Sequence, residues 1–398
     1  MPRLLQIDSC LGVLSTGRIT EGIASIAQEQ GWECHIAHGA RYVGKSNMIS
    51  HQIGSRFTEY LHYAQSLLLD KHGLGSICAT KRLVWKIENE IKPDIIHLHC
   101  IHGYYLNYQI LFEYLNRTNI PVVWTFHDCW AFTGHCAHFV TAGCRRWCES
   151  GCERCPLISS YPKSITDNSL RNFRLKMESF LSKSELTIVA VSEWMKCLVN
   201  ESFFKGKEIE VINNGVDLSK FYPSTRKNVK QTVLGVASAW GVDKGLPDFI
   251  ELRKCLPLEE YDIMLVGVTE QQLSELPEGI IGICKTDSVE ELASLYSAAT
   301  VFVNPTYADT FPSVNIEALA CGTPVITYTT GGSPEIIDGL TGIAVSQGDV
   351  EALAEAIKSL KDAPIDPANC RNRAVEHYDR DVCFKKYIDL YNNLMRLH

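Results

Sequence analysis

Residues 301–337 read VFVNPTYADTFPSVNIEALACGTPVITYTTGGSPEII. Two apolar runs, 301–305 and 324–328, enclose a polar loop and a helix-forming stretch that begins near Pro312. Proline suits the first position of a helix, because the N–H group that it lacks has no partner inside the helix there. Both runs are apolar throughout, which is typical of strands buried on both faces of a parallel sheet. The stretch therefore predicts a strand–helix–strand unit of an α/β fold.

The same alternation extends over the whole chain. We expect strands in its first part at 4–7, 34–38, 94–99, 121–126, 186–191 and 208–212, and in its second part at 232–237, 262–267, 279–284, 301–305, 324–328 and 342–345. Two such series, joined by the polar, turn-rich stretch 213–231, predict two doubly wound, Rossmann-like domains that face a cleft. The domains would cover 1–212 and 213–381.

Composition restricts the partners. Residues 1–230 carry a formal charge of +5 and residues 231–398 one of −13, and +5 is too small for a nucleic-acid footprint. The first ten residues do not resemble a signal peptide, and no apolar run approaches the roughly 18 residues of a membrane helix. We expect a cytoplasmic protein. The basic, amphipathic stretch 169–186 is either an ordinary surface helix or a peripheral contact with the inner membrane face.

Ligands of open α/β sheets bind beyond the carboxyl ends of the strands, so residues that follow strands are the candidates. Gly17 follows the first strand in a loop where Ser15 or Thr16 could cap a helix, and glycine there lets an anion approach the backbone. His127 follows the fourth expected strand, and Lys244 precedes a helix in a glycine-flanked loop. Each also has a structural interpretation: an ordinary turn, a buried histidine or a solvated lysine.

The loop and helix after residues 301–305 carry the most specific pattern. The N–H groups of Ser313 and Val314 would point outward at the helix start, where they suit a diphosphate. Asp309 precedes the helix, and Glu317 lies inside it, eight residues further on. The two carboxylates need not touch, so they could hold different parts of one extended ligand.

Several segments in this order resemble glycosyltransferase family 4: STGRI (15–19), FHDCWAFTGHC (126–136), DKGL (243–246) and DTFPSVNIEALACGTPVI (309–326). The resemblance covers nearly the whole chain. It implies the GT-B fold, with a last helix, 382–398, that packs back on the N-terminal domain, and retaining transfer from a nucleotide-sugar donor. The segment HDCWAFTGHC further resembles bacterial members of polysaccharide and colanic-acid-type biosynthesis clusters.

The resemblance also implies a role for each matching residue. Glu317 would hold the ribose of the donor nucleotide, Asp309 the hydroxyls of the donor sugar, and Lys244 the leaving diphosphate. His127 would contact the sugar near the reacting carbon, and Gly17 would let the diphosphate lie close to the N-terminal domain. The residues expected to cradle sugar and diphosphate are Thr310, Phe311, Pro312, Ser313 and Val314. No metal or other cofactor would be required for transfer.

Three departures from the family pattern affect this expectation. Asp309 stands where the family usually has glutamate, and Pro312 stands where it often has glycine. The arginine common five or six residues before the lysine is absent, because those positions are Ala239 and Ser238. Lys244 is then the evident cation of the loop, and backbone N–H groups would contribute more to holding the diphosphate.

We therefore expect retaining transfer of a hexose-type sugar from a UDP- or GDP-sugar to a saccharide or lipid-linked saccharide, in cell-surface polysaccharide synthesis. Two alternatives remain open. One is a nucleotide-sugar epimerase of the same fold, which needs no acceptor. The other is a non-catalytic nucleotide-sugar-binding scaffold that a metal stabilises.

A cysteine-rich stretch directly follows His127. Six cysteines lie between residues 129 and 155, and Cys136, Cys144, Cys152 and Cys155 end in a Cys-x-x-Cys pair that suits structural zinc. The spacing is not that of a standard zinc finger, and Cys148, His135 and His138 are rival ligands. Free thiols and disulfides are the other interpretations, although disulfides are rare in the cytoplasm.

Overall fold

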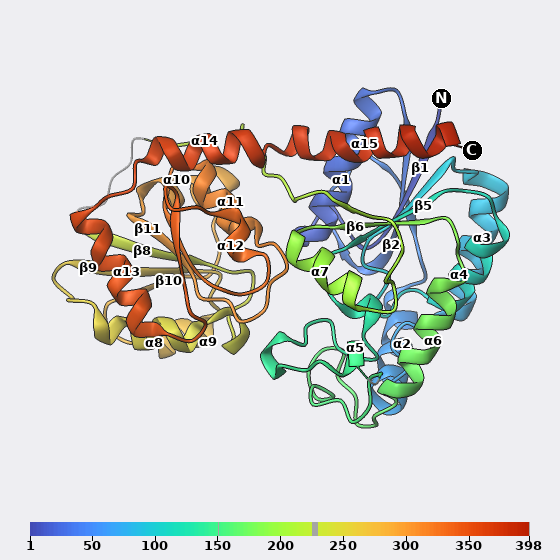
Figure 1. Ribbon diagram of the computed structural model, residues 1–398, viewed down its shortest axis with the longest axis horizontal. Coiled ribbons are helices and arrows are strands. Elements are labelled where there is room, and N and C mark those ends of the chain that lie inside the picture. The colour runs from blue at the N-terminus through green and yellow to red at the C-terminus, as the bar shows by residue number, and fades with distance from the viewer. Residues whose placement is uncertain (150, 225–229, 398) are drawn as a thin grey trace. The chain divides into compact units, whose positions relative to one another are not determined.

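The computed structural model describes residues 1–149, 151–224 and 230–397 (Figure 1). The chain forms two compact units: unit 1 comprises residues 1–212 together with those from Phe384 onward, and unit 2 comprises 213–383. Each unit is built around one parallel sheet with helices on it, which confirms the α/β fold class.

The sheet of unit 1 has the strand order β3-β2-β1-β4-β5-β6-β7, and its neighbouring strands run parallel. The strands are β1 (Arg3–Leu11), β2 (Glu33–Val43), β3 (Ile49–Gln52), β4 (Ile95–Leu98), β5 (Val122–Phe126), β6 (Leu186–Ala190) and β7 (Ile209–Val211). The helices are α1 (Leu14–Glu29), α2 (Arg56–Leu69), α3 (Ile77–Lys86), α4 (Tyr108–Arg117), α5 (Arg146–Glu149), α6 (Ser169–Leu181) and α7 (Glu193–Glu201). The order changes direction between β1 and β4, which is where such sheets bind ligands.

The sheet of unit 2 has the order β10-β9-β8-β11-β12-β13, again with parallel neighbours. The strands are β8 (Gln231–Val236), β9 (Tyr261–Val266), β10 (Ile280–Ile283), β11 (Val301–Asn304), β12 (Val325–Tyr328) and β13 (Gly342–Val345). The helices are α8 (Leu246–Cys255), α9 (Glu270–Glu275), α10 (Val289–Ala298), α11 (Ser313–Ala320), α12 (Ser333–Ile336), α13 (Val350–Asp362), α14 (Pro367–His377) and the first turn of α15 (Arg380–Leu397). The direction changes between β8 and β11.

The expected strands are all present, and the structure adds β3. That strand, with the sequence ISHQ, has a single apolar residue and lies largely exposed at the edge of its sheet. An edge strand that buries neither face needs no apolar run, so the pattern that predicted the others does not mark it.

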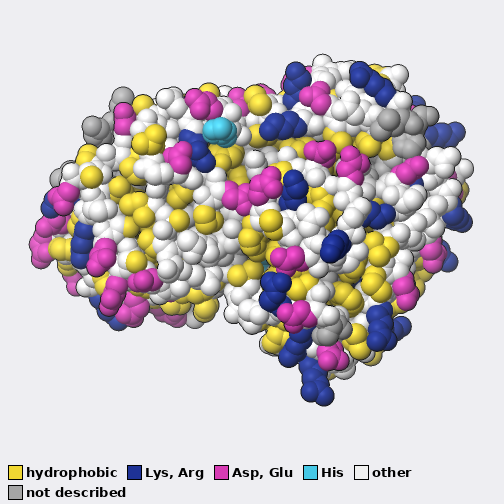
Figure 2. All heavy atoms as spheres, viewed as in Figure 1, with side chains coloured by type: hydrophobic (Ala, Val, Ile, Leu, Met, Phe, Trp, Pro, Cys, Tyr) yellow, Lys and Arg dark blue, Asp and Glu magenta, His cyan; other side chains and the backbone are white. Residues whose placement is uncertain are grey.

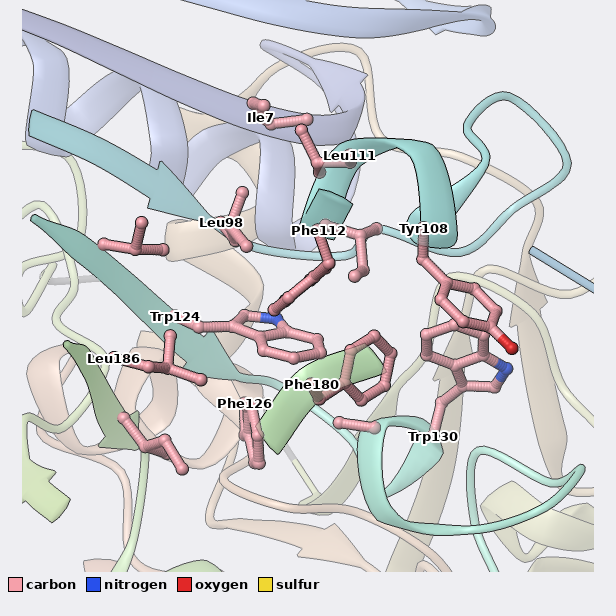
Figure 3. Close-up of a cluster of buried hydrophobic side chains, with 14 of the residues drawn as sticks. Ile7, Leu98, Tyr108, Leu111, Phe112, Trp124, Phe126, Trp130, Phe180 and Leu186 are labelled. Atoms are coloured by element: carbon pink, nitrogen blue, oxygen red, sulfur yellow. The ribbon is translucent and has the colours of Figure 1, made fainter. Parts of the chain in front are cut away.

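Aromatic side chains fill the core of unit 1 beside β5 (Figure 3). The ring of Phe180 on α6 lies 4.9 Å from that of Trp124 on β5 and 4.7 Å from that of Phe112 on α4. The indole N–H of Trp124 donates to the carbonyl of His99 at 3.0 Å, so this polar atom is satisfied inside the core. The packing fixes the end of β5, from which His127 follows.

Helix α15 adds its later part to unit 1. The hydroxyl of Tyr391 pairs with Nδ1 of His97 at 2.6 Å, and Thr125 donates to the hydroxyl of Tyr387 at 3.3 Å. Both tyrosines are fully buried. The C-terminal helix therefore completes the core on which β4 and β5 lie.

Charged side chains are distributed unevenly over the surface. Acidic side chains gather along the α8 and α9 edge of unit 2, whereas Lys and Arg are prominent on the α5 side of unit 1 (Figure 2). On this face the charges follow the difference between the two parts of the sequence.

Candidate functional site

Two residues fix the start of α11 in unit 2. Asn304, at the end of β11, donates from its side-chain amide to Oδ1 of Asn315 at 2.7 Å, and both side chains are buried. Pro312 has φ −68° and precedes the helix, which begins at Ser313. The expectation that Pro312 is the first helical residue is therefore wrong by one position: it occupies the cap. Ser313 and Val314 form the first helical positions, as the diphosphate interpretation requires.

Lys244 and Asp309 form an ion pair. Nζ of Lys244 lies 2.8 Å from Oδ2 of Asp309 and 3.4 Å from the carbonyl oxygen of Ala308. Burial lowers the pKa of Lys244, but the attraction and hydrogen bond of Asp309 outweigh it, so that the pKa rises. The side chain of Lys244 is 31% exposed. Its ammonium group has three N–H donors, and the carboxylate of Asp309 uses only one of them. The ammonium group can therefore still contact an anion.

Two glycines bring this pair together. Gly245 has φ +73°, and a Cβ atom there would lie 2.3 Å from the carbonyl oxygen of Pro305. Gly331 has φ +56°, and its Cβ would lie 1.8 Å from the carbonyl oxygen of Asp309. Only glycine permits both the left-handed backbone and this close approach. The loops that carry Lys244 and Asp309 are thus packed backbone to backbone against their neighbours.

Glu317 lies on α11 beside a buried tyrosine. The hydroxyl of Tyr296 on α10 donates to Oε2 of Glu317 at 3.0 Å, and Tyr296 is fully buried. Burial, followed by the Glu317 carboxylate, raises the pKa of Tyr296 well above its usual value. Tyr296 therefore stays a hydrogen-bond donor and orients the carboxylate.

Thr310 and Phe311 are buried in the loop before α11. The N–H group of Phe311 donates to Oδ1 of Asp309 at 3.3 Å, and its carbonyl accepts from the side-chain amide of Asn214 at 3.3 Å. Phe311 also packs on the ring of Tyr378, with ring centroids 5.8 Å apart. Phe311 thus anchors the loop and positions Asp309 through its backbone.

His127 begins a row of buried polar groups in unit 1. Its Nε2 lies 3.0 Å from Nδ1 of His99, and Nε2 of His99 lies 3.0 Å from the amide oxygen of Gln6. Burial lowers the pKa of His127 to about 4, although the neighbouring Asp128 carboxylate opposes the shift. The imidazole of His127 is therefore neutral at physiological pH.

Asp128 and His102 form a second polar group at the same sheet edge. Oδ2 of Asp128 lies 2.8 Å from Nε2 of His102, whose Nδ1 lies 2.9 Å from the hydroxyl of Tyr161. Burial raises the pKa of Asp128, but His102 outweighs burial and lowers it overall. With Cys100, this pair is the one group of metal-ligand atoms, among the described residues, that all lie within 4.8 Å of one another.

Gly17 lies inside α1 rather than in a loop before it. The helix begins at Leu14, and neither Ser15 nor Thr16 caps it, since the cap residue Val13 offers no side-chain bond. A Cβ atom on Gly17 would lie 3.0 Å from Cβ of Cys10 and 3.2 Å from the backbone nitrogen of Gly12. The glycine therefore lets the first turn of α1 lie against the end of β1.

The cysteines expected to bind metal surround one cavity of unit 1. Its wall includes Cys136, Cys144, Cys152 and Cys155, together with His135. Their ligand atoms do not reach the mutual spacing of 4.8 Å that the Cys100 group shows. The zinc assignment therefore stays a prediction at this point.

The stretch 169–186, expected as an ordinary surface helix or a membrane contact, contains α6, and one face of this helix is packed. Helix α6 buries Asn172, Lys176 and Phe180 against the rest of unit 1, and Phe180 lies in its aromatic core. None of the described helices has the length and apolar character to cross a bilayer.

Comparison with known proteins places both units in one family. The family model named Glycosyltransferase Family 4 matches residues 19–220, about half of the chain, and Glycosyl transferases group 1 matches residues 230–362. The chain belongs to glycosyltransferase family 4. It is thus a glycosyltransferase, as the motifs predicted.

Individual proteins agree with this assignment. The chain is 24% identical over 395 residues to a putative colanic acid biosynthesis glycosyl transferase, WcaC, of Escherichia coli, which covers 92% of this chain and 94% of that protein. Sucrose-phosphate synthase from Thermosynechococcus elongatus matches with a TM-score of 0.71, 17% identity and full coverage of both chains. Anabaena HepE in complex with UDP matches with a TM-score of 0.67 and 14% identity, covering 99% of this chain and 100% of that one. These structures confirm the GT-B fold.

Sequence reasoning missed the residues that hold the site residues in place. Tyr296, which bonds to Glu317, lies in an ordinary amphipathic helix and carries no motif. His99 and His102 had a visible signal, because HLHCIH (97–102) places three histidines at the end of an apolar strand. Several histidines at and directly after a strand were the available clue in the sequence.

Proposed function

We propose that this glycosyltransferase transfers a hexose-type sugar, with retention, from a UDP- or GDP-sugar to a saccharide or lipid-linked saccharide of a cell-surface polysaccharide. Unit 2 would bind the donor and unit 1 the acceptor. The similarity to the WcaC protein over nearly the whole chain supports the acceptor class. The UDP complex of HepE, a protein of the same fold, supports a nucleotide-sugar donor.

The observation that best supports this function is the arrangement of charged groups around the start of α11. The N-terminus of α11 and the tyrosine-oriented carboxylate of Glu317 lie on one helix, and Lys244, from the loop before α8, adds a partly exposed ammonium group that is paired with Asp309. A helix start stabilises anions, and Lys244 adds a full positive charge. Glu317, one turn further on, is a hydrogen-bond acceptor for the hydroxyls of a ribose. This set suits the two ends of a nucleoside diphosphate.

The proposed reaction uses these groups on the leaving side. The bond between the anomeric carbon and the diphosphate oxygen breaks, and the diphosphate takes the electron pair. The acceptor hydroxyl forms the new bond on the same face and gives its proton to the departing phosphate oxygen. Lys244 and the N–H groups of Ser313 and Val314 would stabilise the diphosphate charge as it develops, which lowers the barrier.

Asp309 has two proposed roles. It would accept hydrogen bonds from hydroxyls of the donor sugar, and its ion pair would hold Lys244 toward the diphosphate. Thr310, Phe311 and Pro312 would shape the loop around the sugar. Gly17 and His127 of unit 1 keep the donor-contacting roles that the family resemblance implies. The neutral imidazole of His127 suits contact with sugar hydroxyls rather than with a phosphate.

The test combines binding and turnover. A thermal-shift panel of nucleotides and nucleotide sugars should show stabilisation by one nucleotide class, because a ligand that binds the folded state raises the melting temperature. Transfer with that donor should then fall by about 10²–10³-fold in Glu317→Gln and Lys244→Ala. The matched controls, Glu355→Gln and Lys254→Ala, change exposed residues of unit 2 and should leave transfer unchanged.

Three results would count against the proposal. Near-wild-type transfer by both site variants would remove the site assignment. A product that forms without any acceptor would favour an epimerase. Binding of a nucleotide sugar without turnover on any saccharide or lipid-linked acceptor would favour a scaffold.

We also propose that α2 makes a peripheral contact with a membrane. Helix α2 turns polar residues inward and aromatic residues outward. It buries Glu59 and His62, whereas Phe57 and Tyr60 are 69% and 66% exposed. An apolar outer face with a flanking cation, Arg56, suits an anionic bilayer that carries a lipid-linked acceptor.

Sedimentation with phosphatidylethanolamine–phosphatidylglycerol vesicles tests this proposal. Phe57→Ser with Tyr60→Ser should reduce the bound fraction. Leu340→Ser, a change at an equally exposed leucine of unit 2, should not. Equal binding by all three proteins, or binding by none, would overturn it.

A further inference from the structure

The segment between β5 and α6, whose described residues are 127–149 and 151–168, has little regular structure of its own. It contains two 3₁₀ turns, Trp130–Phe132 and Val140–Ala142, and the single turn of α5. Loops of this length inside a compact domain are uncommon and are usually functional or disordered. Three aromatic rings, those of Phe132, Phe139 and Trp147, pack on one another within the segment and join it to the hydrophobic core of unit 1.

One cavity collects the metal-ligating side chains of this segment. Cys136, Cys144, Cys152, Cys155 and His135 all line it. The rival Cys148 does not, since it lines a different depression, and its thiol donates to the carbonyl of Arg145 at 3.1 Å. His138 is likewise absent from the cavity wall. The structure thus narrows the candidate ligands from seven to five.

The two ring nitrogens of His135 have different surroundings, which suit a metal ligand. Its Nδ1 lies 2.6 Å from Oδ1 of Asp70, and both side chains are fully buried. The other ring nitrogen, Nε2, has no hydrogen-bond partner among the described residues. A buried nitrogen without a partner is unfavourable, because its desolvation is not compensated. A carboxylate on one nitrogen and a metal on the other is the usual arrangement of a zinc-binding histidine.

The thiols are arranged to accept hydrogen bonds as metal-bound thiolates do. The N–H group of Gly134 donates to Sγ of Cys152 at 3.1 Å. The backbone N–H of Cys155 donates to Oδ2 of Asp167 at 2.6 Å, which holds the chain at this cysteine. A Cβ atom on Gly134 would lie 2.6 Å from Cβ of Cys152, so glycine is needed for this contact.

A buried lysine lies beside the cavity, next to Thr133 of the cavity wall. Lys176 is 1% exposed, and its Nζ donates to the carbonyls of Trp130 at 2.6 Å and Thr133 at 2.9 Å. Zinc with three or four thiolates has a net negative charge, which a buried ammonium group would balance.

We propose that this cavity binds one structural zinc ion through the thiolates of Cys136, Cys152 and Cys155 and a fourth ligand, either His135 or Cys144. The ion would draw the sulfur atoms inward to the usual Zn–S distance of about 2.3 Å. Four protein ligands leave no open position, so the metal stabilises the segment and takes no part in catalysis. The inference does not depend on the proposed transfer reaction.

The first measurement is the metal content of the full chain purified without chelator. One zinc per chain is expected, with cobalt substitution giving the visible absorption of a tetrahedral thiolate site. Zinc content well below one, with these cysteines titrating as free thiols, would overturn the proposal. A mass two hydrogens lower, which indicates a disulfide, would overturn it as well.

Two variants then identify the fourth ligand. Whichever of His135→Asn and Cys144→Ser loses zinc marks that position, and full retention by both would contradict the ligand set. Cys148→Ser is the matched control, because that thiol lies outside the cavity, and it should keep both zinc and melting temperature. If a variant does not fold, cobalt spectra of the wild-type chain decide the number of thiolate ligands.

Discussion

The β11–α11 loop of unit 2 and the cysteine-rich segment of unit 1 are both irregular, but different interactions hold them. The first is short and is fixed by its own backbone: Gly331 packs on the carbonyl of Asp309, and Asn304 bonds to Asn315. The second extends over forty residues and is held through side chains that converge on one cavity. A loop that must place charges on a ligand is thus built from contacts that leave little freedom. Beyond His127 the second carries no proposed substrate contact, so it can rely on a few convergent side chains.

Of the changes predicted for these two regions, Gly331→Ala should reduce the transfer rate most. The new Cβ would meet the carbonyl of Asp309 at 1.8 Å in a left-handed backbone, so the loop must move. Displacing a site residue by about 1 Å costs on the order of 10²-fold in rate. Steady-state transfer assays should show this loss, whereas Gly339→Ala, which meets nothing within 4 Å, should be near wild type. Equal activity of the two variants would show that the backbone contact does not position Asp309.

Removal of metal should affect the other region selectively. With a zinc chelator, limited proteolysis should cut within residues 137–167 at a lower protease concentration, while the loop 305–312 stays resistant. The melting temperature should fall, since the ligand of the folded state is lost. Thermal denaturation and mass spectrometry of the fragments measure both effects. New cleavage in unit 2, or no change in either unit, would contradict the prediction that a metal holds only the segment of unit 1.

Tyr296→Phe should have a smaller effect, confined to unit 2. The change removes the hydroxyl that donates to Glu317 at 3.0 Å and keeps the buried ring. A hydrogen bond to a charged group contributes about 1.5–3 kcal/mol. We expect the donor KM to rise and kcat to change little, because the carboxylate is less well oriented. Tyr261→Phe, at another buried tyrosine of unit 2, is the control and should alter neither constant.

The fold was largely predictable from the sequence, because buried parallel strands have continuous apolar runs. The apolar run at 301–305 and the polar residues behind it located β11 and its loop correctly. The pairing of Lys244 with Asp309 was not predictable, since the two are 65 positions apart and their approach depends on Gly245 and Gly331. The helix starts at Leu14 and Ser313 were each misplaced, because in both cases the backbone turns without a side-chain cap.

The smallest predicted effect is on the pH dependence of folding stability. It should be seen in unit 1 and not in unit 2. Burial holds the pKa of His127 at about 4 in the folded chain, below its usual 6.5. The unfolded chain therefore binds a proton first as pH falls, so this group's stabilising contribution is present above pH 6.5 and is lost between about 6.5 and 4. Asp8 opposes this trend, because burial raises its pKa to about 6. In urea unfolding, the free energy of unfolding of His127→Gln should fall less steeply between pH 6.5 and 4 than that of the wild type. The difference should be confined to the transition of unit 1. An unchanged slope would mean that His127 is as well solvated in the folded chain as in the unfolded one.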